Sequence, residues 1–405
     1  MLESPFRLTP LVVRPTAADE VSFIVHSHLR WNFVWQRPQQ ILSRLARDHR
    51  ILFIEEPLAA PALARLELSE PHPNVIRAVP LLPRAADLSV EQQYHLIVPM
   101  LQRALREDPL LAGRFERSVQ WFYSPMPAPQ TLNQLAAQAV VYDCMDELSS
   151  FRFAPSDIAQ RERLLLANAD VVFTGGHQLY EAKSQHHANV HFYGCGVDAQ
   201  HFGQARSDDL AVPDDIARLT APVLGYFGVI DERLDYDLLE LLAASFPHAS
   251  IAMVGPLAKV ETDQLPHREN IHWLGQRAYA DLPGVVKGFD VCLMPFAMNA
   301  ATRYINPTKT LEYMAAGKPI VSTAVPDVIR NFTPIVAVAH SSQDFVAEVA
   351  SALTRADPAR IAQGIARAES AGWEAIVASM RAHILEVLVT GGDAGYYPSP
   401  LHGVA

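Results

Sequence analysis

The stretch INPTKTLEYMAAGKPIVST, residues 305–323, predicts a short helix that leads into a buried strand. Asn306 is a preferred N-cap residue, and Pro307 suits the first helical turn because its missing N–H would be unpaired there in any case. Gly317 can adopt the left-handed conformation that ends a helix, and Pro319 prevents the helix from continuing. The apolar β-branched residues that follow are typical of a core strand.

The start of this helix is a candidate anion-binding site. Unpaired backbone N–H groups and the helix dipole favour a negative charge there. Lys309 lies in the first turn, where the dipole disfavours a cation unless an anion is bound nearby. Glu312 follows three residues later on the same face, so that a cation and a carboxylate flank one pocket. A phosphate for Lys309 and a polyol for Glu312 fit this pattern. An ordinary Lys–Glu pair on a surface helix is the alternative.

The motif P-x-K-x-x-E-Y-x-A-x-G-K-P-x-V in this stretch resembles the donor-site segment of GT-B glycosyltransferases. The resemblance is to family 4 (group 1) enzymes of bacterial surface-polysaccharide and teichuronic acid biosynthesis. It implies that Glu312 binds the ribose of a nucleotide sugar, and that Thr308 and Lys309 at the helix start bind its diphosphate. Many members carry a second glutamate eight residues before the first, where this chain has Tyr304. The donor sugar and the stereochemical course of transfer therefore stay open.

The composition is that of a globular protein with an acidic balance. Its 405 residues are enough for two domains, and 49% of them are apolar. The formal net charge of −11 argues against nucleic acid as a partner, because phosphate backbones call for a basic surface. The three cysteines lie far apart in the chain, which is not typical of structural zinc or of a disulfide framework.

The N-terminal residues lack a basic segment followed by an apolar one, and no apolar run is long enough to span a bilayer. We therefore expect a cytoplasmic protein. Any association with the membrane would be peripheral, at the inner face of the cell membrane.

Alternation of strands and helices predicts parallel sheets. Residues 21–25 and 51–54 have strand patterns on either side of a helix that starts near Pro38, which makes a β-α-β unit. Residues 87–119 are expected to be mainly helical, and the strand–helix alternation resumes after residue 223. Together with the resemblance, this predicts a GT-B fold, in which two Rossmann-like α/β domains face each other across a cleft. The expected parts are an acceptor-binding domain (1–205), a donor-binding domain (206–372), and a crossover helix and tail (373–405) that pack on the first domain.

The loop after the first strand is a candidate acceptor site, because ligands of such sheets bind beyond the carboxyl ends of the strands. It contains His26 and His28, and it runs into the segment WQRPQQ, which resembles the N-terminal segment of the same glycosyltransferases and includes Arg37. Trp31 and Trp35 either line the cleft or pack in the core.

His177 is a further candidate on the acceptor side. It follows the strand of residues 169–173 and a turn with two glycines, Gly175 and Gly176, which let a backbone approach a ligand closely. In the family, this turn faces the cleft between the domains.

Asp143 and Asp146 follow the predicted strand of residues 139–142. A carboxylate at the carboxyl end of a parallel strand points into the crevice, where a general base would be needed. The segment resembles a D-x-x-D-E segment of the same enzymes, so we take both residues as candidates for contact with the acceptor or for its activation. The alternative is that Asp146 caps the next helix.

Two loops of the second domain complete the predicted donor site. The resemblance implies that Gly228 admits the donor diphosphate to the backbone, that Arg233 binds it, and that the backbone at Gly275 holds the nucleotide base. Asp235 and Asp237 form a D-x-D sequence, which holds a metal in another class of transferases. Here Asp235 fits better as the N-cap of the next helix, so that no metal is expected.

The predicted reaction is transfer of a glycosyl group from a nucleoside-diphosphate sugar to an acceptor hydroxyl, with Lys309, Asp143 and Asp146 as catalytic candidates. The donor is a co-substrate, with UDP favoured over GDP, and no separate cofactor is expected. The acceptor would be a saccharide or a lipid-linked saccharide of a bacterial surface polysaccharide. Two alternatives are a sugar-nucleotide epimerase on the same two-domain plan and a non-catalytic subunit that binds a nucleotide sugar.

Overall fold

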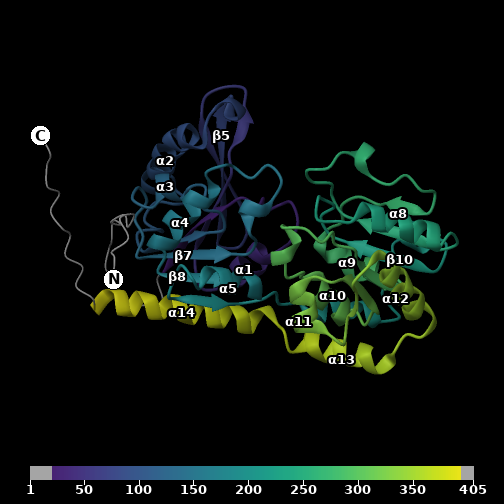
Figure 1. The fold of residues 1–405 in the computed structure, drawn as a ribbon. Helices are drawn as coiled ribbons and strands as arrows, with labels where there is room; N and C mark the ends of the chain where they lie inside the picture. Colours follow the sequence, from purple (N-terminus) through teal and green to yellow (C-terminus); the bar gives the residue numbers. More distant parts are fainter. Residues whose placement is uncertain (1–20, 394–405) are drawn as a thin grey trace, which may run out of the picture.

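The computed structural model describes residues 21–393, which form two α/β units side by side (Figure 1). Within this range the first unit holds a nine-stranded sheet in the order β3-β5-β2-β1-β6-β7-β8-β9, with β4 paired to β5. The second unit, within the same range, holds a six-stranded sheet in the order β12-β11-β10-β13-β14-β15. Neighbouring strands run parallel, with β4 and β5 as the antiparallel pair. The predicted pair of Rossmann-like sheets is confirmed.

The strands of the first sheet are β1 (Ser22–Ser27), β2 (Ile51–Glu55), β3 (Leu58–Ala60), β4 (Arg65–His72), β5 (Val75–Pro83), β6 (Ser118–Phe122), β7 (Ala139–Cys144), β8 (Val171–Thr174) and β9 (Val190–Phe192). Those of the second are β10 (Val223–Phe227), β11 (Ser250–Val254), β12 (Ile271–Trp273), β13 (Val291–Met294), β14 (Ile320–Thr323) and β15 (Ala337–Ala339). The helices of the first unit are α1 (Arg37–Leu45), α2 (Val90–Glu107), α3 (Ala128–Thr131), α4 (Ile158–Asn168) and α5 (His177–Lys183). The remaining helices are α6 (Ala199–Gly203), α7 (Asp214–Ala217), α8 (Tyr236–Ser245), α9 (Leu282–Lys287), α10 (Lys309–Ala315), α11 (Pro326–Phe332), α12 (Ser342–Thr354), α13 (Pro358–Glu369) and α14 (Trp373–Asp393).

Helices cover both faces of the first sheet. Successive side chains of a strand point to opposite faces, so the core of this unit is divided into apolar clusters on the two faces. On β1, Phe23 and Val25 pack in one apolar cluster with α1 and α14, whereas Ile24 packs in another with α2. All residues of β1, β2, β6, β7 and β8 are buried, as expected for parallel strands between two helical layers. This rigid sheet fixes the loops that follow its strands.

The C-terminal helix returns to the first unit, as predicted. Trp373 is 1% exposed and belongs to the same apolar cluster as β1, together with four further residues of α14: Val377, Met380, Ile384 and Leu388. Figure 1 shows α14, in yellow, running below the first unit. The chain passes between the two units twice, and the two connecting segments lie side by side. They are joined by a hydrogen bond from the Val197 N–H to the Ala371 carbonyl at 2.9 Å. The tail beyond residue 393 lies outside the described residues, as do residues 1–20.

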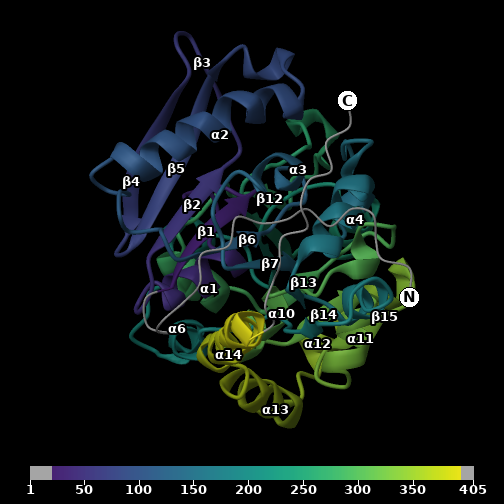
Figure 2. The same cartoon turned by 90° about the vertical axis from the view of Figure 1, so that its left-hand side faces the viewer.

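A β-rich arm in the first unit was not predicted. Strands β3, β4 and β5 occupy residues 58–83, and α2 lies across β4 and β5 (Figure 2). The expected helical run over 87–119 was too long, because α2 ends at Glu107 and is followed by turns. Exposed and half-buried residues alternate irregularly along β4, so its sequence lacks the apolar pattern of the parallel strands.

The structure corrects the predicted start of the donor-site helix. Helix α10 begins at Lys309 with Thr308 in the N-cap position, so the prediction of Asn306 as the N-cap was wrong. The Asn306 amide instead donates to the Gly175 carbonyl of the first unit at 3.0 Å. At the other end Gly317 has φ +71°, and the Lys318 N–H donates to the Tyr313 carbonyl at 3.1 Å. This is the predicted left-handed helix end, closed by a Schellman pattern.

Candidate functional site

A cleft lies between the two units, at the carboxyl ends of the strands of both sheets, where ligands of open α/β sheets bind. From the first unit it is lined by Trp35, Arg37, Gln40 and Asp146, and from the second by Gly228, Arg233, Thr308, Lys309 and Glu312, among others. The Gln40 amide donates to the Tyr279 hydroxyl at 3.0 Å, which joins the two sides. The cleft therefore brings together residues from both halves of the chain.

A close contact between Lys309 and the loop after β10 forms the floor of the second unit's side. Gly228 has φ +145°, and a Cβ atom there would lie 1.9 Å from Cε of Lys309. Gly255 has φ +155°, and a Cβ there would lie 1.7 Å from the Gly228 carbonyl oxygen. Both positions therefore require glycine, because any side chain would displace the lysine or the loop. Nζ of Lys309 lies 5.7 Å from the centre of the Tyr226 ring.

Lys309, which is half-buried, and Glu312, which is buried, lie one turn apart on α10 and have opposite charge when ionised. Burial lowers the pKa of Lys309, and the neighbouring carboxylate of Glu312 partly opposes this shift. Glu312 is 9% exposed, and burial raises its pKa to about 7 in spite of the ammonium group of Lys309. Two ionisable groups with perturbed pKa values in a cleft are typical of a functional site. A bound anion beside Lys309 would stabilise its charged form.

Arg233 forms a local pair with Asp231 in the loop after β10. Its Nη2 lies 2.7 Å from Oδ2 of Asp231, and its Nε is 3.0 Å from both carboxylate oxygens. The arginine side chain is 25% exposed and lines the cleft. This pairing holds the guanidinium group in place and leaves part of it open to a ligand.

Asp146 lies on the opposite wall of the cleft. Burial raises its pKa to about 6, with Arg233 opposing this shift and Asp231 adding to it. The helical turn that follows has Glu147 in its N-cap position and no side-chain cap, so the alternative role of Asp146 as a helix cap was wrong. The remaining prediction, contact with an acceptor or its activation, is untested.

Asp143 does not reach the cleft, although Arg37 does. The Arg37 guanidinium donates to Asp143 through Nε at 3.1 Å and Nη2 at 2.9 Å, and to the Tyr193 carbonyl through Nη1 at 2.7 Å. Asp143 is 0% exposed and is not part of the cleft lining. A catalytic role for Asp143 does not fit this geometry, since a carboxylate enclosed by an arginine cannot meet a substrate. Its position instead orients Arg37.

The three histidines predicted for the acceptor side lie outside this cleft. His26 is 1% exposed and stacks on Phe122 with ring centres 4.6 Å apart; burial lowers its pKa to about 4. His177 stacks on Phe192 at 3.8 Å, and its backbone N–H donates to Asp327 of the second unit at 2.7 Å. His28 lines a separate cavity of the first unit. The placement of His26 in the acceptor site does not fit, because its strand position directs the side chain into the core.

Of the two other predicted donor residues, one lines the cleft and one does not. Thr308 lines the cleft. Gly275 is exposed and has a φ of +70°, and its neighbours Gln276 and Arg277 line the cleft in its place. The two tryptophans also separate. Trp31 is 4% exposed and packs edge-on against Phe53, whereas Trp35 lines the cleft.

Residues that the prediction missed include Gln40, Cys195 and Asn306, all of which line the cleft. Gln40 could have been predicted, because it belongs to the WQRPQQ segment that resembles the N-terminal segment of the glycosyltransferases. Cys195 and Asn306 contact each other, since the thiol donates to the Asn306 carbonyl at 3.2 Å. That contact joins the two units and is set only by their docking.

Within residues 21–393, the structure contains no group of three or more His, Cys, Asp or Glu side chains placed to hold a metal ion. No helix in the same range is both long enough and apolar enough to cross a membrane. The Asp235 carboxylate accepts from the Leu238 N–H at 2.9 Å at the start of α8. Its predicted role as an N-cap is confirmed.

Known proteins resemble this chain in sequence and in fold. Residues 221–355 match the family model described as Glycosyl transferases group 1. The chain has the GT-B fold, and its second unit is similar to this family. It is 26% identical over 241 residues to a Bacillus subtilis protein provisionally named as the teichuronic acid biosynthesis glycosyltransferase TuaH. That match covers 55% of this chain and 59% of the Bacillus protein, less than two thirds of its length.

Solved structures share the fold over almost the whole chain. Sucrose-phosphate synthase from Thermosynechococcus elongatus matches 91% of this chain and 99% of its own, with a TM-score of 0.69 and 16% identity. A UDP-forming α,α-trehalose-phosphate synthase from Burkholderia xenovorans, in complex with glucose-6-phosphate, matches 91% of this chain and 100% of its own. Its TM-score is 0.63 and its identity is 13%. An Escherichia coli trehalose-6-phosphate structure bound with UDP-2-fluoro glucose has a TM-score of 0.65 and 14% identity. The match covers 91% of this chain and 99% of the Escherichia coli chain. At these identities the likeness establishes the fold alone.

Proposed function

We propose that this protein transfers a glycosyl group from a nucleoside-diphosphate sugar to an acceptor hydroxyl. The observation that carries the proposal is the meeting of Lys309, Arg233 and Glu312 in one cleft, beside the glycine backbone of Gly228. All four residues belong to the segment that matches the group 1 glycosyltransferases. The epimerase and the binding subunit have no support from the relatives described above.

In this proposal, the second domain holds the donor through its diphosphate and ribose. Lys309, Arg233 and the first turn of α10, with Thr308, stabilise the leaving diphosphate, since fixed positive charge aimed at developing negative charge is often the largest catalytic contribution. Glu312 accepts hydrogen bonds from ribose hydroxyls, and the backbone near Gly275 holds the base. UDP is the preferred nucleotide, and the reaction needs no metal ion.

Asp146 is the residue we assign to the acceptor hydroxyl. It lines the cleft on the wall opposite Lys309, and its pKa of about 6 leaves the carboxylate ionised in most molecules at neutral pH. It can therefore accept a proton, while its pKa is close enough to neutrality for the proton to be passed on. Arg37 lines the same wall and contributes positive charge beside it.

The likeness to TuaH supports a saccharide acceptor in bacterial surface-polysaccharide biosynthesis. The acceptor is either free or lipid-linked in this proposal. A lipid-linked acceptor would bring the protein to the inner face of the membrane as a peripheral component, since no helix among residues 21–393 could span it.

The test is calorimetry with UDP, GDP, ADP and CMP on the wild-type protein and on Lys309→Ala and Glu312→Ala. We expect UDP to bind most tightly, and each substitution to weaken it at least tenfold, which is about 1.4 kcal/mol. Glu269→Ala is the matched control, because this glutamate is exposed in the same domain. Its affinity should be that of the wild type. Failure of all four nucleotides to bind folded wild-type protein would overturn the donor site.

A further inference from the structure

The segment that follows Asp146 begins at a fixed point of the first domain. The Glu147 carboxylate accepts from Nζ of Lys183 at 2.7 Å. Lys183 lies on α5, is 4% exposed, and also donates to Glu162 of α4 at 2.8 Å. A buried lysine with two carboxylate partners is costly to separate from either of them, so it holds the start of the segment in place. The chain then continues through the single helical turn Leu148–Ser150.

After this turn, Phe151 and Arg152 contact the second domain. The Arg152 N–H donates to the Glu232 carboxylate at 3.1 Å. The ring of Phe151 lies beside two cations: its centre is 5.8 Å from Cζ of Arg233 and 4.9 Å from Nζ of Lys259. Both distances are within the range of a cation–π contact, which extends to about 6 Å. One side chain of the first domain therefore contacts two positive charges of the second.

Of these two cations, Arg233 lines the cleft between the domains and Lys259 does not. The Asp231 carboxylate accepts from Nε and Nη2 of Arg233. The third nitrogen, Nη1, makes no hydrogen bond to any residue in the range 21–393. Since the side chain is 25% exposed and lines the cleft, the two N–H groups of Nη1 are available to a ligand there.

The contact with Phe151 restrains Arg233 without using any of its N–H donors. An aromatic ring attracts a cation through the negative charge of its face, so the guanidinium group keeps its capacity to donate hydrogen bonds. A second carboxylate in the place of the ring would take up the remaining donors and compensate the positive charge. A cation that is already restrained also loses less conformational entropy when it binds an anion, which increases the affinity. This arrangement suits an arginine that binds a diphosphate.

The same contact connects the two sides of the cleft. Phe151 follows Asp146 in one loop of the first domain, and the charge of Arg233 opposes the rise of the Asp146 pKa that burial causes. The ring is not itself part of the cleft lining. Any effect of Phe151 on a bound nucleotide is therefore transmitted by the arginine.

We propose that Phe151 is a positioning residue for the donor diphosphate, and that it acts by holding Arg233. The inference rests on the proposed glycosyltransferase function and adds a contribution of the first domain to nucleotide affinity. Lys259, the other cation at the ring, does not take part in this role, because it lies outside the cleft lining.

The experiment measures UDP affinity by calorimetry for the wild type, Phe151→Leu and Phe151→Tyr. Phe151→Leu keeps an apolar side chain but removes the aromatic face, and it should weaken UDP binding about two- to fivefold. Phe151→Tyr keeps the face and should bind UDP like the wild type. Phe153→Leu is the matched control, because this phenylalanine of the same loop is 78% exposed and its ring lies 5.1 Å from Cζ of Arg152. Its UDP affinity should be that of the wild type.

A double-mutant cycle separates the positioning role from a general effect on the loop. In an Arg233→Met background, Phe151→Leu should cause no further loss of UDP affinity. In a Lys259→Met background, Phe151→Leu should weaken UDP by the same factor as in the wild type. Thermal unfolding shows whether each variant is folded, and Phe151→Met takes the place of Phe151→Leu if leucine is not tolerated.

The proposal is overturned if folded Phe151→Leu binds UDP like the wild type, or if Phe151→Tyr is as weak as Phe151→Leu. It is also overturned if Phe151→Leu weakens UDP equally in the Arg233→Met background, since the ring would then act on the loop and not on the arginine. All three results leave UDP binding by the wild type intact. A folded wild-type protein that binds no nucleotide would overturn the proposed function itself, and this inference with it.

Discussion

Two arginines line the cleft, one from each domain, and each is paired with an aspartate behind it; the two pairs differ in burial. Arg37 and Asp143 of the first domain are 2.9 Å apart, with side chains 3% and 0% exposed. Arg233 and Asp231 of the second are 2.7 Å apart, with side chains 25% and 9% exposed. The first pair joins α1 to β7 across 106 residues of sequence, whereas the second joins neighbours in one loop.

The comparison shows that the same pairing chemistry has two uses. The buried pair fixes the geometry of the first domain, because neither charge could be left alone in that environment. The partly exposed pair leaves the outer edge of its arginine open to the cleft. Burial, and not residue type, separates an arginine with a structural role from one whose side chain stays open to the cleft.

The largest expected effect is on the buried pair. Asp143→Ala should lower the free energy of unfolding by about 3–5 kcal/mol, because Arg37 is then buried without a counter-charge. Asp231→Ala should cost only about 1 kcal/mol, since Arg233 can be hydrated from the cleft. Chemical denaturation of both variants measures the difference. Equal losses would contradict the contrast between the two pairs.

A second prediction concerns the pH dependence of the donor side. Burial raises the pKa of Glu312 from 4.5 in the unfolded chain to about 7. Between these pH values the unfolded chain releases the proton while the folded protein keeps it. The stability that this group contributes is therefore lost as pH rises, by up to about 3 kcal/mol. Denaturation of wild type and Glu312→Gln across this window should show that only the wild type carries this loss. Parallel pH profiles of the two proteins would count against the shifted pKa.

In the first domain, His26 should make the free energy of unfolding depend on pH in the opposite direction. Burial lowers the pKa of His26 from 6.5 to about 4, so the unfolded chain binds a proton that the folded protein does not. Stability is therefore lost as pH falls between these values, by up to about 3 kcal/mol. The His26→Gln variant has no titratable group at this position, so its free energy of unfolding should fall less than that of the wild type as the pH is lowered. The measurement is the change in unfolding free energy with pH. An unchanged acid sensitivity would mean that His26 is protonated in the folded domain.

The smallest effect concerns the two aspartates that begin α8 in the second domain. Asp235→Ala should lower the free energy of unfolding by about 1 kcal/mol, because it removes the N-cap hydrogen bond to Leu238. Asp237 is exposed in the first helical turn, so Asp237→Ala should cost only about 0.3–1 kcal/mol through the helix dipole. Neither change should alter UDP affinity measured by calorimetry. A loss of nucleotide binding in Asp235→Ala would give this residue a role beyond capping.

Local features of the sequence predicted much of the fold and half of the site. Gly317 ends its helix and Asp235 caps another, because each depends on residues only a few positions away. Lys309 and Glu312 lie in the cleft for the same reason, since helical spacing fixes their common face. The arm of β3, β4 and β5 was not predicted, because its strand β4 lacks the apolar pattern that marks the buried strands.

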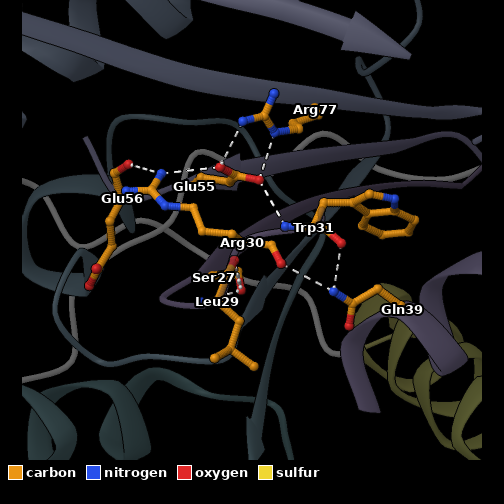
Figure 3. Close-up of polar contacts among 8 residues, drawn as sticks. All are labelled: Ser27, Leu29, Arg30, Trp31, Gln39, Glu55, Glu56 and Arg77. Carbon is orange, nitrogen blue, oxygen red and sulfur yellow. Dashed lines mark hydrogen bonds and ion pairs between the residues drawn. The ribbon is translucent and has the colours of Figure 1, made fainter. Parts of the chain in front are cut away.

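The sequence by itself determined the alternation that builds two parallel sheets, the edge of each sheet at which the cleft lies, and the helix that carries Lys309 and Glu312. Tertiary structure alone decided which of the other candidates could reach a ligand. Asp143 and Asp146 are three residues apart, yet one is enclosed by Arg37 and the other lines the cleft. Glu55 and Glu56 are adjacent, yet Glu55 is buried against two arginines, whereas the side chain of Glu56 is exposed and turns away from them (Figure 3). The reason is physical: burial and ion pairing are set by segments distant in the chain, and local sequence does not specify which of them will meet.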